Sequence, residues 1–502
     1  AFWPPVAAFV CQNSHGSPLR PTQPLVPTAS QRKSWGCQLS SSTQEDTPIP
    51  QQQQSTPQFP PPPLPPQERQ RRPRYQGRYP RNFHEKYKEL RGDESTIQKV
   101  LQKGMTPAGT HVPIMLSECL HYMGIQKMNT NAGQQQLDDD DLLLLPQTTT
   151  PALVVDCTLG YGGHSSHLIQ ALKERNNQVA SGSKENDSPI RTTSRLIALD
   201  QDAIELRKTD ERLRSKFILD QHDNDNNDNT PIFTAVHENF GNLGHYLETI
   251  GETGQVTSLL ADLGLSSMQI DDNERGFTYK REGPLDMRMN TNTNGTSTLS
   301  ESAAVSSETA YDLLCRLKPK QFESMLQENS DEIYATEIAQ GLLGKNKKKG
   351  SKKPVIPKTT TELAERVRAI VEPLMQAAEF DKKKSSHKAT ASDIDIPKAL
   401  LDSTVARVMQ ALRIELNGEF RVLEQLLEDL PSILAPGGRA VFLTFHSGED
   451  RRVKKAMKAG YKSGIYSSWS RNAVRPTAQE RRDNPRSSCC KLRWVVRSNQ
   501  AI

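Results

Sequence analysis

Residues 154–165 read V-V-D-C-T-L-G-Y-G-G-H-S, and this stretch decides the fold. An apolar run enters it, a glycine-rich turn follows, and an amphipathic segment leaves it, which predicts a strand, a tight turn and a helix. Glycines at 160, 162 and 163 carry no side chain, so the backbone can approach a ligand closely at the carboxyl end of a sheet. A turn that binds nothing would use the same glycines, and both interpretations stay open at this point.

Apolar runs and amphipathic segments alternate on both sides of this turn. Strands are predicted at residues 153–157, 196–199, 232–236, 258–261 and 440–445. Helices are predicted at residues 163–175, 203–214, 308–317, 331–343, 361–375 and 406–429. This alternation is typical of an α/β fold, in which helices cover both faces of a mostly parallel sheet.

Differences in composition along the chain predict its domain organisation. Residues 105–289 and 404–497 hold the strand signals and predict the sheet domain. Residues 290–403 are helical, carry no strand signal and contain low-complexity loops, so we expect a helical insertion domain. Residues 1–95 predict a disordered, presequence-like tail, because the first 84 residues hold 17 of the 33 prolines and a glutamine run.

The N-terminal tail carries both a targeting signal and the positive charge. It is Ser-rich, bears arginines and is poor in acids, as transit presequences are. It is therefore consistent with targeting to an organelle, either a plastid or a mitochondrion, and an ordinary disordered tail on a cytoplasmic protein is the alternative. Nine Lys or Arg and three Asp or Glu fall in residues 1–84. The net charge of +5 is thus no argument that the rest of the chain binds nucleic acid.

Composition and spacing exclude two kinds of protein and one kind of site. No apolar run approaches the roughly 18 residues that span a bilayer, so we expect no membrane-spanning segment and no membrane partner. The seven cysteines include no C-x-x-C pair, which argues against a disulfide scaffold and a Cys-rich zinc module. His164 and His167 could share a metal, but no third ligand cluster accompanies them, so no metal site is predicted.

Two predicted strands end in acids that can face a ligand. Asp200 ends the run L-I-A-L-D, where its carboxylate can accept hydrogen bonds from both hydroxyls of an adenosine ribose. A polar insert separates Asp200 from Gly160, so spacing alone does not distinguish a nicotinamide dinucleotide from S-adenosylmethionine, or a bound ligand from a solvated acid. Asp262 ends the later strand and lies against the small-residue turn at 264–267.

The last predicted strand ends in F-H-S-G-E-D-R and brings His446, Ser447, Glu449 and Asp450 to the same edge of the sheet. A Ser/His/Asp hydrolase is disfavoured, because adjacent side chains on a strand point to opposite faces and the chain has no G-x-S-x-G elbow.

Residues 451–497 then hold 14 Lys or Arg against two Asp or Glu. Between them lie the aromatic residues Tyr461, Tyr466, Trp469 and Trp494. This composition predicts an RNA-facing surface, with a solvated basic tail as the alternative.

Several blocks of sequence together resemble one family. They are H-V-P-I-M-L-S-E, the glycine turn, L-D-Q-D, E-N-F-G-N-L, D-L-G-L-S-S-M-Q, R-G-F-T-Y, P-L-D-M-R-M, Q-A-L-R-I-E-L-N-G-E, A-P-G-G-R, F-H-S-G-E-D-R and K-L-R. The chain is identified by them as resembling the MraW/RsmH family, the bacterial-type small-subunit ribosomal RNA cytosine-N(4) methyltransferases. The resemblance covers most of residues 105–497 outside the inserts. It implies a Rossmann-like class I methyltransferase sheet with an inserted helical domain, S-adenosyl-L-methionine as cofactor, and small-subunit ribosomal RNA or the small ribosomal subunit as partner.

The resemblance also implies a set of cofactor contacts. They fall on Gly162, Gly163, His164, Asp200, Phe240, Asp262 and Gln269. The chain departs from the family pattern at Met268, where proline is usual, and at Gly448, where leucine is usual. A third departure is the segment H-P-A-T-R, which an insert splits between residues 387–390 and Arg407. This split concerns the helical domain and leaves the cofactor contacts intact.

The implied reaction needs a group that accepts a hydrogen bond from the cytidine amine, whose lone pair is conjugated with the ring. Our candidate catalytic residue is Asp262, with a backbone carbonyl of residues 263–266 as the alternative, and Phe277 or Tyr279 could stack on the base. Two other functions stay open. A nicotinamide-dependent oxidoreductase shares the glycine turn and strand-end acid but needs a second nucleotide-binding half, and a non-catalytic ribosome-assembly factor could retain the fold. The sequence gives no basis for an oligomeric state.

Overall fold

The computed structural model describes residues 113–127, 151–182, 193–217, 231–290, 308–344, 355–382 and 395–499. The predicted tail at residues 1–95, and with it the targeting signal, lies outside these residues. None of the helices in the described segments combines the length and apolarity needed to cross a membrane.

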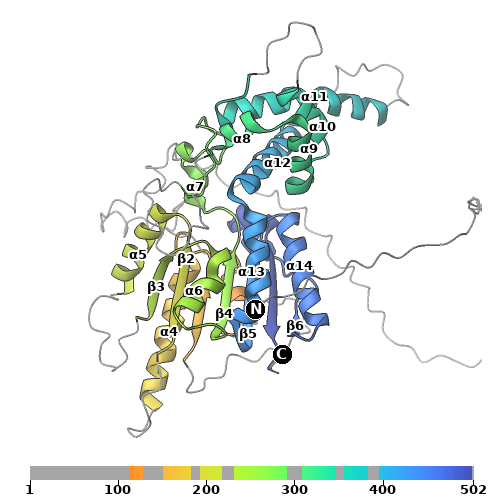
Figure 1. The fold of residues 1–502 in the computed structure, drawn as a ribbon. Helices are drawn as coiled ribbons and strands as arrows, with labels where there is room; N and C mark the ends of the chain where they lie inside the picture. The colour runs from red at the N-terminus through yellow and green to blue at the C-terminus, as the bar shows by residue number, and fades with distance from the viewer. Residues whose placement is uncertain are drawn as a thin grey trace, which may run out of the picture. The chain divides into compact units, whose positions relative to one another are not determined.

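A seven-stranded sheet forms the centre of the fold (Figure 1), with the strand order β3-β2-β1-β4-β5-β7-β6. The strands are β1 (Leu153–Asp156), β2 (Arg195–Asp200), β3 (Phe233–His237), β4 (Val256–Asp262), β5 (Leu434–Thr444), β6 (Tyr466–Trp469) and β7 (Lys491–Arg497). β1 to β5 pair in parallel, and β7 and β6 add an antiparallel edge. The five predicted strands and the predicted α/β class are confirmed, whereas β6 and β7 were not predicted.

Helices cover both faces of this sheet, because successive strand residues point to opposite sides. Val154 and Leu196 pack on the face covered by α3 (Leu116–Tyr122), α4 (Gly163–Gly182) and α5 (Ala203–Phe217). Val155 and Ile197 pack on the other face, which is covered by α6 (Leu243–Thr249), α13 (Glu419–Ile433) and α14 (Ser447–Lys462). The central strands are therefore buried on both sides, and their carboxyl ends are the part left to meet a ligand.

A second hydrophobic core lies among five other helices. They are α8 (Ala310–Arg316), α9 (Pro319–Ser330), α10 (Ala335–Leu343), α11 (Thr360–Lys382) and α12 (Lys398–Asn417). We call this group the helical cluster. Its core also takes in Leu285 and Met287, and it continues past the predicted boundary at residue 404, which falls inside α12.

Two predicted helices differ from the structure in their bounds. The helix expected at residues 406–429 is broken at Gly418, whose φ of 60° ends α12 before α13 begins at Glu419. The helix expected at residues 331–343 begins at Ala335, and α9 precedes it. Pro319 is the first residue of α9, a position from which the helix needs no amide hydrogen. Asp331 ends the helix with a left-handed φ of 52°.

Candidate functional site

A cavity of about 800 Å³ opens at the carboxyl ends of β1, β2, β4 and β5. Six of the seven predicted cofactor residues line it, namely Gly163, His164, Asp200, Phe240, Asp262 and Gln269. The seventh, Gly162, is not among the lining residues. Side chains of the helical cluster also line the cavity, among them Gln410, Arg413 and Asn417. These three residues were not predicted from the sequence.

The glycines of the first turn have different roles. A side-chain carbon at Gly162 would lie 2.9 Å from Thr209 Cγ2 of α5, and one at Gly163 would lie 3.0 Å from Pro113 Cγ. One at Gly160 would meet nothing closer than 3.9 Å, although its φ of 49° is left-handed. Gly162 and Gly163 therefore allow the turn to pack on its own protein, and Gly160 leaves room for a ligand.

Asp200 ties the end of β2 to this turn. Its carboxylate accepts hydrogen bonds from the backbone N–H of Gly160 at 2.8 Å and of Asp202 at 2.9 Å. Burial raises the pKa of Asp200 from 3.8 to about 7, even though the two backbone donors lower it. Each carboxylate oxygen has a further lone pair, so the group can still accept from ligand hydroxyls at the cavity wall.

Asp262 and His164 lie together at the ends of β4 and the first turn. The Asp262 Oδ2 atom is 3.6 Å from His164 Nδ1, and His164 Nε2 donates to the Ile114 carbonyl at 3.1 Å. Burial raises the pKa of Asp262 from 3.8 to about 6, against the lowering effect of His164. The charges of Asp156 and Glu449 raise this pKa further. With this pKa, Asp262 is mostly charged at pH 7 and becomes neutral as the pH falls below about 6.

Asp156 is a site-organising residue that the sequence analysis missed. It is 1% exposed and accepts hydrogen bonds from the Thr158 backbone at 3.0 Å and from Ser165 Oγ at 2.6 Å. The Thr158 hydroxyl in turn accepts from the Asp262 backbone N–H at 2.8 Å. The signal was present, because Asp156 ends the apolar run V-V-D, where a strand gives way to the turn.

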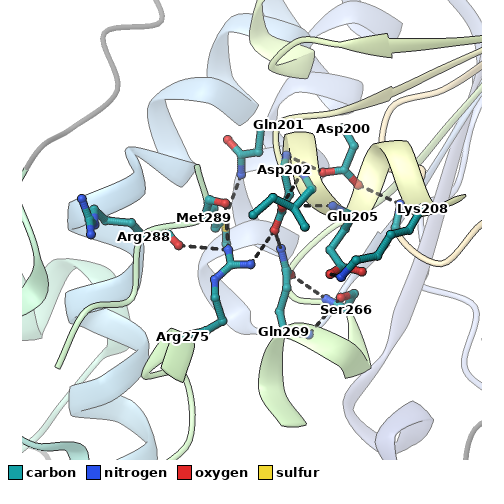
Figure 2. Close-up of polar contacts among 12 residues, drawn as sticks. Asp200, Gln201, Asp202, Glu205, Lys208, Ser266, Gln269, Arg275, Arg288 and Met289 are labelled. Atoms are coloured by element: carbon teal, nitrogen blue, oxygen red, sulfur yellow. Dashed lines mark hydrogen bonds and ion pairs between the residues drawn. The ribbon is translucent and has the colours of Figure 1, made fainter. Parts of the chain in front are cut away.

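Gln269 and Phe240 complete the part of the cavity that the predicted cofactor residues line. The Gln269 amide oxygen accepts from the Ser266 backbone at 3.1 Å, and its nitrogen donates to Asp202 Oδ2 at 3.3 Å (Figure 2). These contacts fix the side chain at the start of α7 (Ser267–Asp271). Phe240 follows β3 in the short helix η2 (Phe240–Asn242), where its ring can stack on a planar ligand.

A second group of side chains lines the same cavity, and we call it the polar wall: Arg413 of α12, Glu419 of α13, and His446 and Glu449 at the start of α14. Arg413 donates to both oxygens of Glu419, at 2.7 and 2.8 Å. His446 Nε2 lies 3.0 Å from Glu449 Oε1, and Glu449 Oε2 accepts from the Phe445 backbone at 2.8 Å. Burial raises the pKa of Glu449, but its hydrogen bond with His446 and the nearby charges outweigh burial and hold this pKa below 4.5.

The polar wall resembles a metal site in spacing but not in bonding. One ligand atom from each of Glu419, His446 and Glu449 lies within 4.8 Å of the others, the one such group among the described residues. Arg413 already binds both oxygens of Glu419, and a guanidinium at this distance repels a cation. The arrangement instead offers hydrogen-bond acceptors beside a fixed donor, which suits a neutral polar ring.

The other residues predicted to act at this edge of the sheet differ in where the structure places them. Ser447 donates to Asp331 at 2.8 Å rather than to His446, in agreement with the expectation that no hydrolase triad forms. Phe277 and Tyr279 line the cavity as expected of stacking residues. The prediction that Tyr466 and Trp494 face RNA is wrong. Both are buried, because they lie on the antiparallel strands β6 and β7, which the sequence analysis missed.

The basic segment at residues 451–497 is partly buried and partly exposed. Arg493 and Lys491 pair with Asp450 at 2.6 and 2.8 Å, so they belong to the body of the protein. Arg451 pairs with Asp331 of the helical cluster. The other exposed cations of α14 are Lys454, Lys455, Lys458 and Lys462. These four lysines form the surface on this helix that is free to meet phosphate groups.

Comparison with known proteins gives a consistent result. A family model described as "MraW methylase family" matches residues 108–498. A protein of Agathobacter rectalis named "Ribosomal RNA small subunit methyltransferase H 1" is 37% identical over 430 residues, covering 85% of this chain and 97% of that protein. The protein of the same name from Lachnoclostridium phytofermentans is 35% identical over 85% of this chain and 93% of its own length. "Ribosomal RNA small subunit methyltransferase H 2" of Alkaliphilus metalliredigens is 33% identical, with 86% and 99% covered.

Proposed function

The chain belongs to the MraW methylase family, and from this premise we propose that it is a ribosomal RNA methyltransferase. We infer further that it transfers a methyl group from S-adenosyl-L-methionine to the N4 amine of a cytidine in small-subunit ribosomal RNA. One observation supports the finer proposal: a single cavity is lined both by Asp200 and Phe240, which suit a nucleoside, and by the polar wall. A substrate base can therefore reach a cofactor without leaving the cavity.

The residues on the cofactor side fit S-adenosylmethionine. Asp200 offers acceptors for two ribose hydroxyls, and Phe240 offers an aromatic face for the adenine. Gly160 leaves the space between them clear of protein. A positive sulfonium near Asp262 would favour the charged form of that carboxyl, whose pKa is about 6 without a ligand. The bound cofactor would supply an electrophilic methyl carbon.

The polar wall complements the hydrogen-bonding edge of cytosine. Cytosine presents an amine donor beside two acceptors, and a glutamate beside an arginine offers the matching acceptor and donors. Uracil would place a carbonyl oxygen against the carboxylate of Glu419. Such an edge is available only when the base is unpaired, so we expect the RNA to present the cytidine splayed out of its stack.

Asp262 is our candidate for the group that activates the amine. The amine has two hydrogens, and with one bonded to the polar wall the other can be accepted by Asp262. Because Glu449 raises the pKa of Asp262, the two sides of the cavity interact electrostatically. A hydrogen bond to the amine localises its lone pair on nitrogen, and holding the base in line with the methyl carbon lowers the barrier by several kcal/mol.

Incorporation of labelled methyl groups tests this function. The protein is incubated with labelled S-adenosylmethionine and small ribosomal subunits, and the nucleosides are separated after digestion. The proposal expects label in N4-methylcytidine, and a marked loss of the single-turnover rate in Asp262→Asn at saturating cofactor. A full rate in Asp262→Asn would exclude the role of Asp262. RNA binding without incorporation would instead support a non-catalytic assembly factor.

The compartment stays a prediction from the N-terminal tail. If the tail targets an organelle, depletion of the protein should remove N4-methylcytidine from plastid or mitochondrial small-subunit RNA and leave the cytosolic RNA unchanged. Loss of the modification from cytosolic RNA would contradict that prediction.

A further inference from the structure

We propose that Arg275 is a positioning residue that couples the cofactor side of the cavity to the polar wall. The inference deepens the proposed function, on which it rests for the identity of the two ligands. Arg275 ends the short helix η3 (Asn273–Arg275), and its side chain is 12% exposed. Figure 2 shows its guanidinium between Asp202 on one side and the segment around Met289 on the other.

On the cofactor side, Arg275 binds the residue that sets the position of Asp200. Its Nη1 atom donates to Asp202 Oδ2 at 2.7 Å, and the Asp202 side chain is 1% exposed. The Asp202 backbone N–H donates to the Asp200 carboxylate. The other Asp202 oxygen accepts from the backbone N–H groups of Ile204 and Glu205 in the first turn of α5. A ligand that moves the Asp200 carboxylate therefore acts on Asp202 and, through it, on Arg275.

On its other side, the Arg275 guanidinium donates hydrogen bonds to backbone carbonyls of a strained segment, residues 287–289. Its Nη2 atom donates to the carbonyls of Arg288 at 3.1 Å and Met289 at 2.9 Å, and its own carbonyl accepts from the Met287 amide at 3.1 Å. Met287 has a φ of 62°, in the left-handed region that disfavours residues other than glycine, and its side chain is buried in the core of the helical cluster. Without these hydrogen bonds, the backbone at Met287 would lower its energy by leaving the left-handed region.

The same segment is attached to the end of α12 beside the polar wall. The Met289 amide donates to Asn417 Oδ1 at 2.8 Å, and Asn417 Nδ2 donates to the Met287 carbonyl at 3.0 Å. Asn417 is the last residue of α12, and Glu419 of the polar wall follows after Gly418. The path of contacts thus runs from Asp200 and Asp202 through Arg275 to Asn417 and the wall.

The geometry requires the guanidinium fork rather than a positive charge alone. Arginine reaches a carboxylate and two carbonyls at once, whereas the compact ammonium of lysine can keep the carboxylate but not all three. Arg275→Lys should therefore bind S-adenosylhomocysteine within about threefold of the wild type. Its single-turnover methyl transfer should fall about 10- to 100-fold, since a small displacement of a positioned base is costly.

Arg281→Lys is the matched control. Arg281 lies in the same loop, and its side chain pairs with Asp271 at 3.3 Å instead of with the residues that Arg275 contacts. It should change neither affinity nor rate. Asn417→Asp, which loses the donor to Met287, should repeat the split shown by Arg275→Lys. Equal losses of affinity and rate in Arg275→Lys and Asn417→Asp, or wild-type rates in both, would overturn the proposal.

Hydrogen exchange supplies a readout that does not depend on methyl transfer. S-adenosylhomocysteine should slow exchange of the Met287 and Met289 amides about tenfold in the wild type, and leave them unchanged in Arg275→Lys. Equal protection in both proteins, or none in the wild type, would overturn the coupling. If the wild type shows the protection but transfers no methyl group, the coupling stands and the proposed reaction fails.

Discussion

The two sides of the cavity are built from different kinds of contact. On the cofactor side, the Asp200 carboxylate accepts hydrogen bonds from two backbone amides, and the Asp156 carboxylate accepts from one backbone amide and from two hydroxyls. Both acids stand at the ends of parallel strands. On the polar wall, pairs of side chains hold one another: Arg413 with Glu419, and His446 with Glu449. The position of Asp200 therefore depends on the course of the chain, whereas the wall depends on a few individual side chains.

The largest expected effect comes from Glu419→Gln, which separates the two sides most sharply. The change keeps the shape of the side chain but removes the charge that Arg413 binds, so the edge presented to the base is altered. Methyl transfer should fall about 100-fold or more, as when one preorganised group of an active site is removed. Affinity for S-adenosylhomocysteine, measured by calorimetry, should not change.

Glu424→Gln is the control for that substitution, since Glu424 pairs with Arg452 and is 59% exposed. It should leave the rate of transfer unaltered. A loss of cofactor affinity in Glu419→Gln as large as its loss of rate would show that the two sides are not separable.

Added salt should weaken RNA binding and leave cofactor binding unchanged. If Lys454, Lys455, Lys458 and Lys462 each contact one phosphate, raising salt from about 50 to 200 mM should lower transfer at limiting RNA about 50-fold. Replacing the four lysines by glutamine should flatten this dependence, and cofactor affinity should be constant throughout. A rate that does not respond to salt would contradict the assignment of this surface.

Cofactor affinity should depend on pH through Asp200. Its pKa is about 7 in the free protein, and the charged form is the one that accepts from ribose hydroxyls. Affinity for S-adenosylhomocysteine should therefore rise about tenfold from pH 6 to 8 and level off above. Asp200→Asn should abolish the slope, and a slope that persists in this variant would assign the titration to another group, Asp262 foremost.

The same raised pKa gives a signed prediction for stability. Between its unfolded pKa near 3.8 and its folded pKa of about 7, Asp200 binds more protons when the chain is folded. Its contribution to the free energy of unfolding is therefore complete below the lower value and is lost as the pH rises through the upper one. Urea titrations at pH 5 and 8 measure this change.

The smallest expected effect tests how the cofactor side is packed. Gly162 and Gly251 both have a φ of 71°, but a side-chain carbon meets Thr209 at 2.9 Å in the first case and nothing within 4 Å in the second. Each alanine substitution should cost about 1 kcal/mol for its backbone conformation. Gly162→Ala should cost roughly 1 kcal/mol more for overpacking. Equal free energies of unfolding would mean that the turn does not pack tightly on α5.

How much of the site could be predicted from the sequence follows from the same contrast. Asp200 and Asp262 are the last residues of apolar strands and His164 lies at the start of the helix after the glycine turn, so local pattern and family resemblance were enough to identify them. Arg413, Glu419 and Glu449 meet only because α12 ends at Gly418 and α13 packs beside α14, and the unbroken helix expected at residues 406–429 concealed that break. Trp494 was misassigned because its partner strand was not recognised, and a basic neighbourhood in sequence is no guide to burial.

The central claim is that a cofactor and a cytidine meet across one cavity. Its most direct test is the identity of the labelled nucleoside after a single turnover with labelled S-adenosylmethionine and small ribosomal subunits, in the wild type and in Glu419→Gln. The account predicts N4-methylcytidine from the wild type and a loss of about 100-fold in the variant. Label in another position or another base, or the same yield of N4-methylcytidine from both proteins, would contradict it.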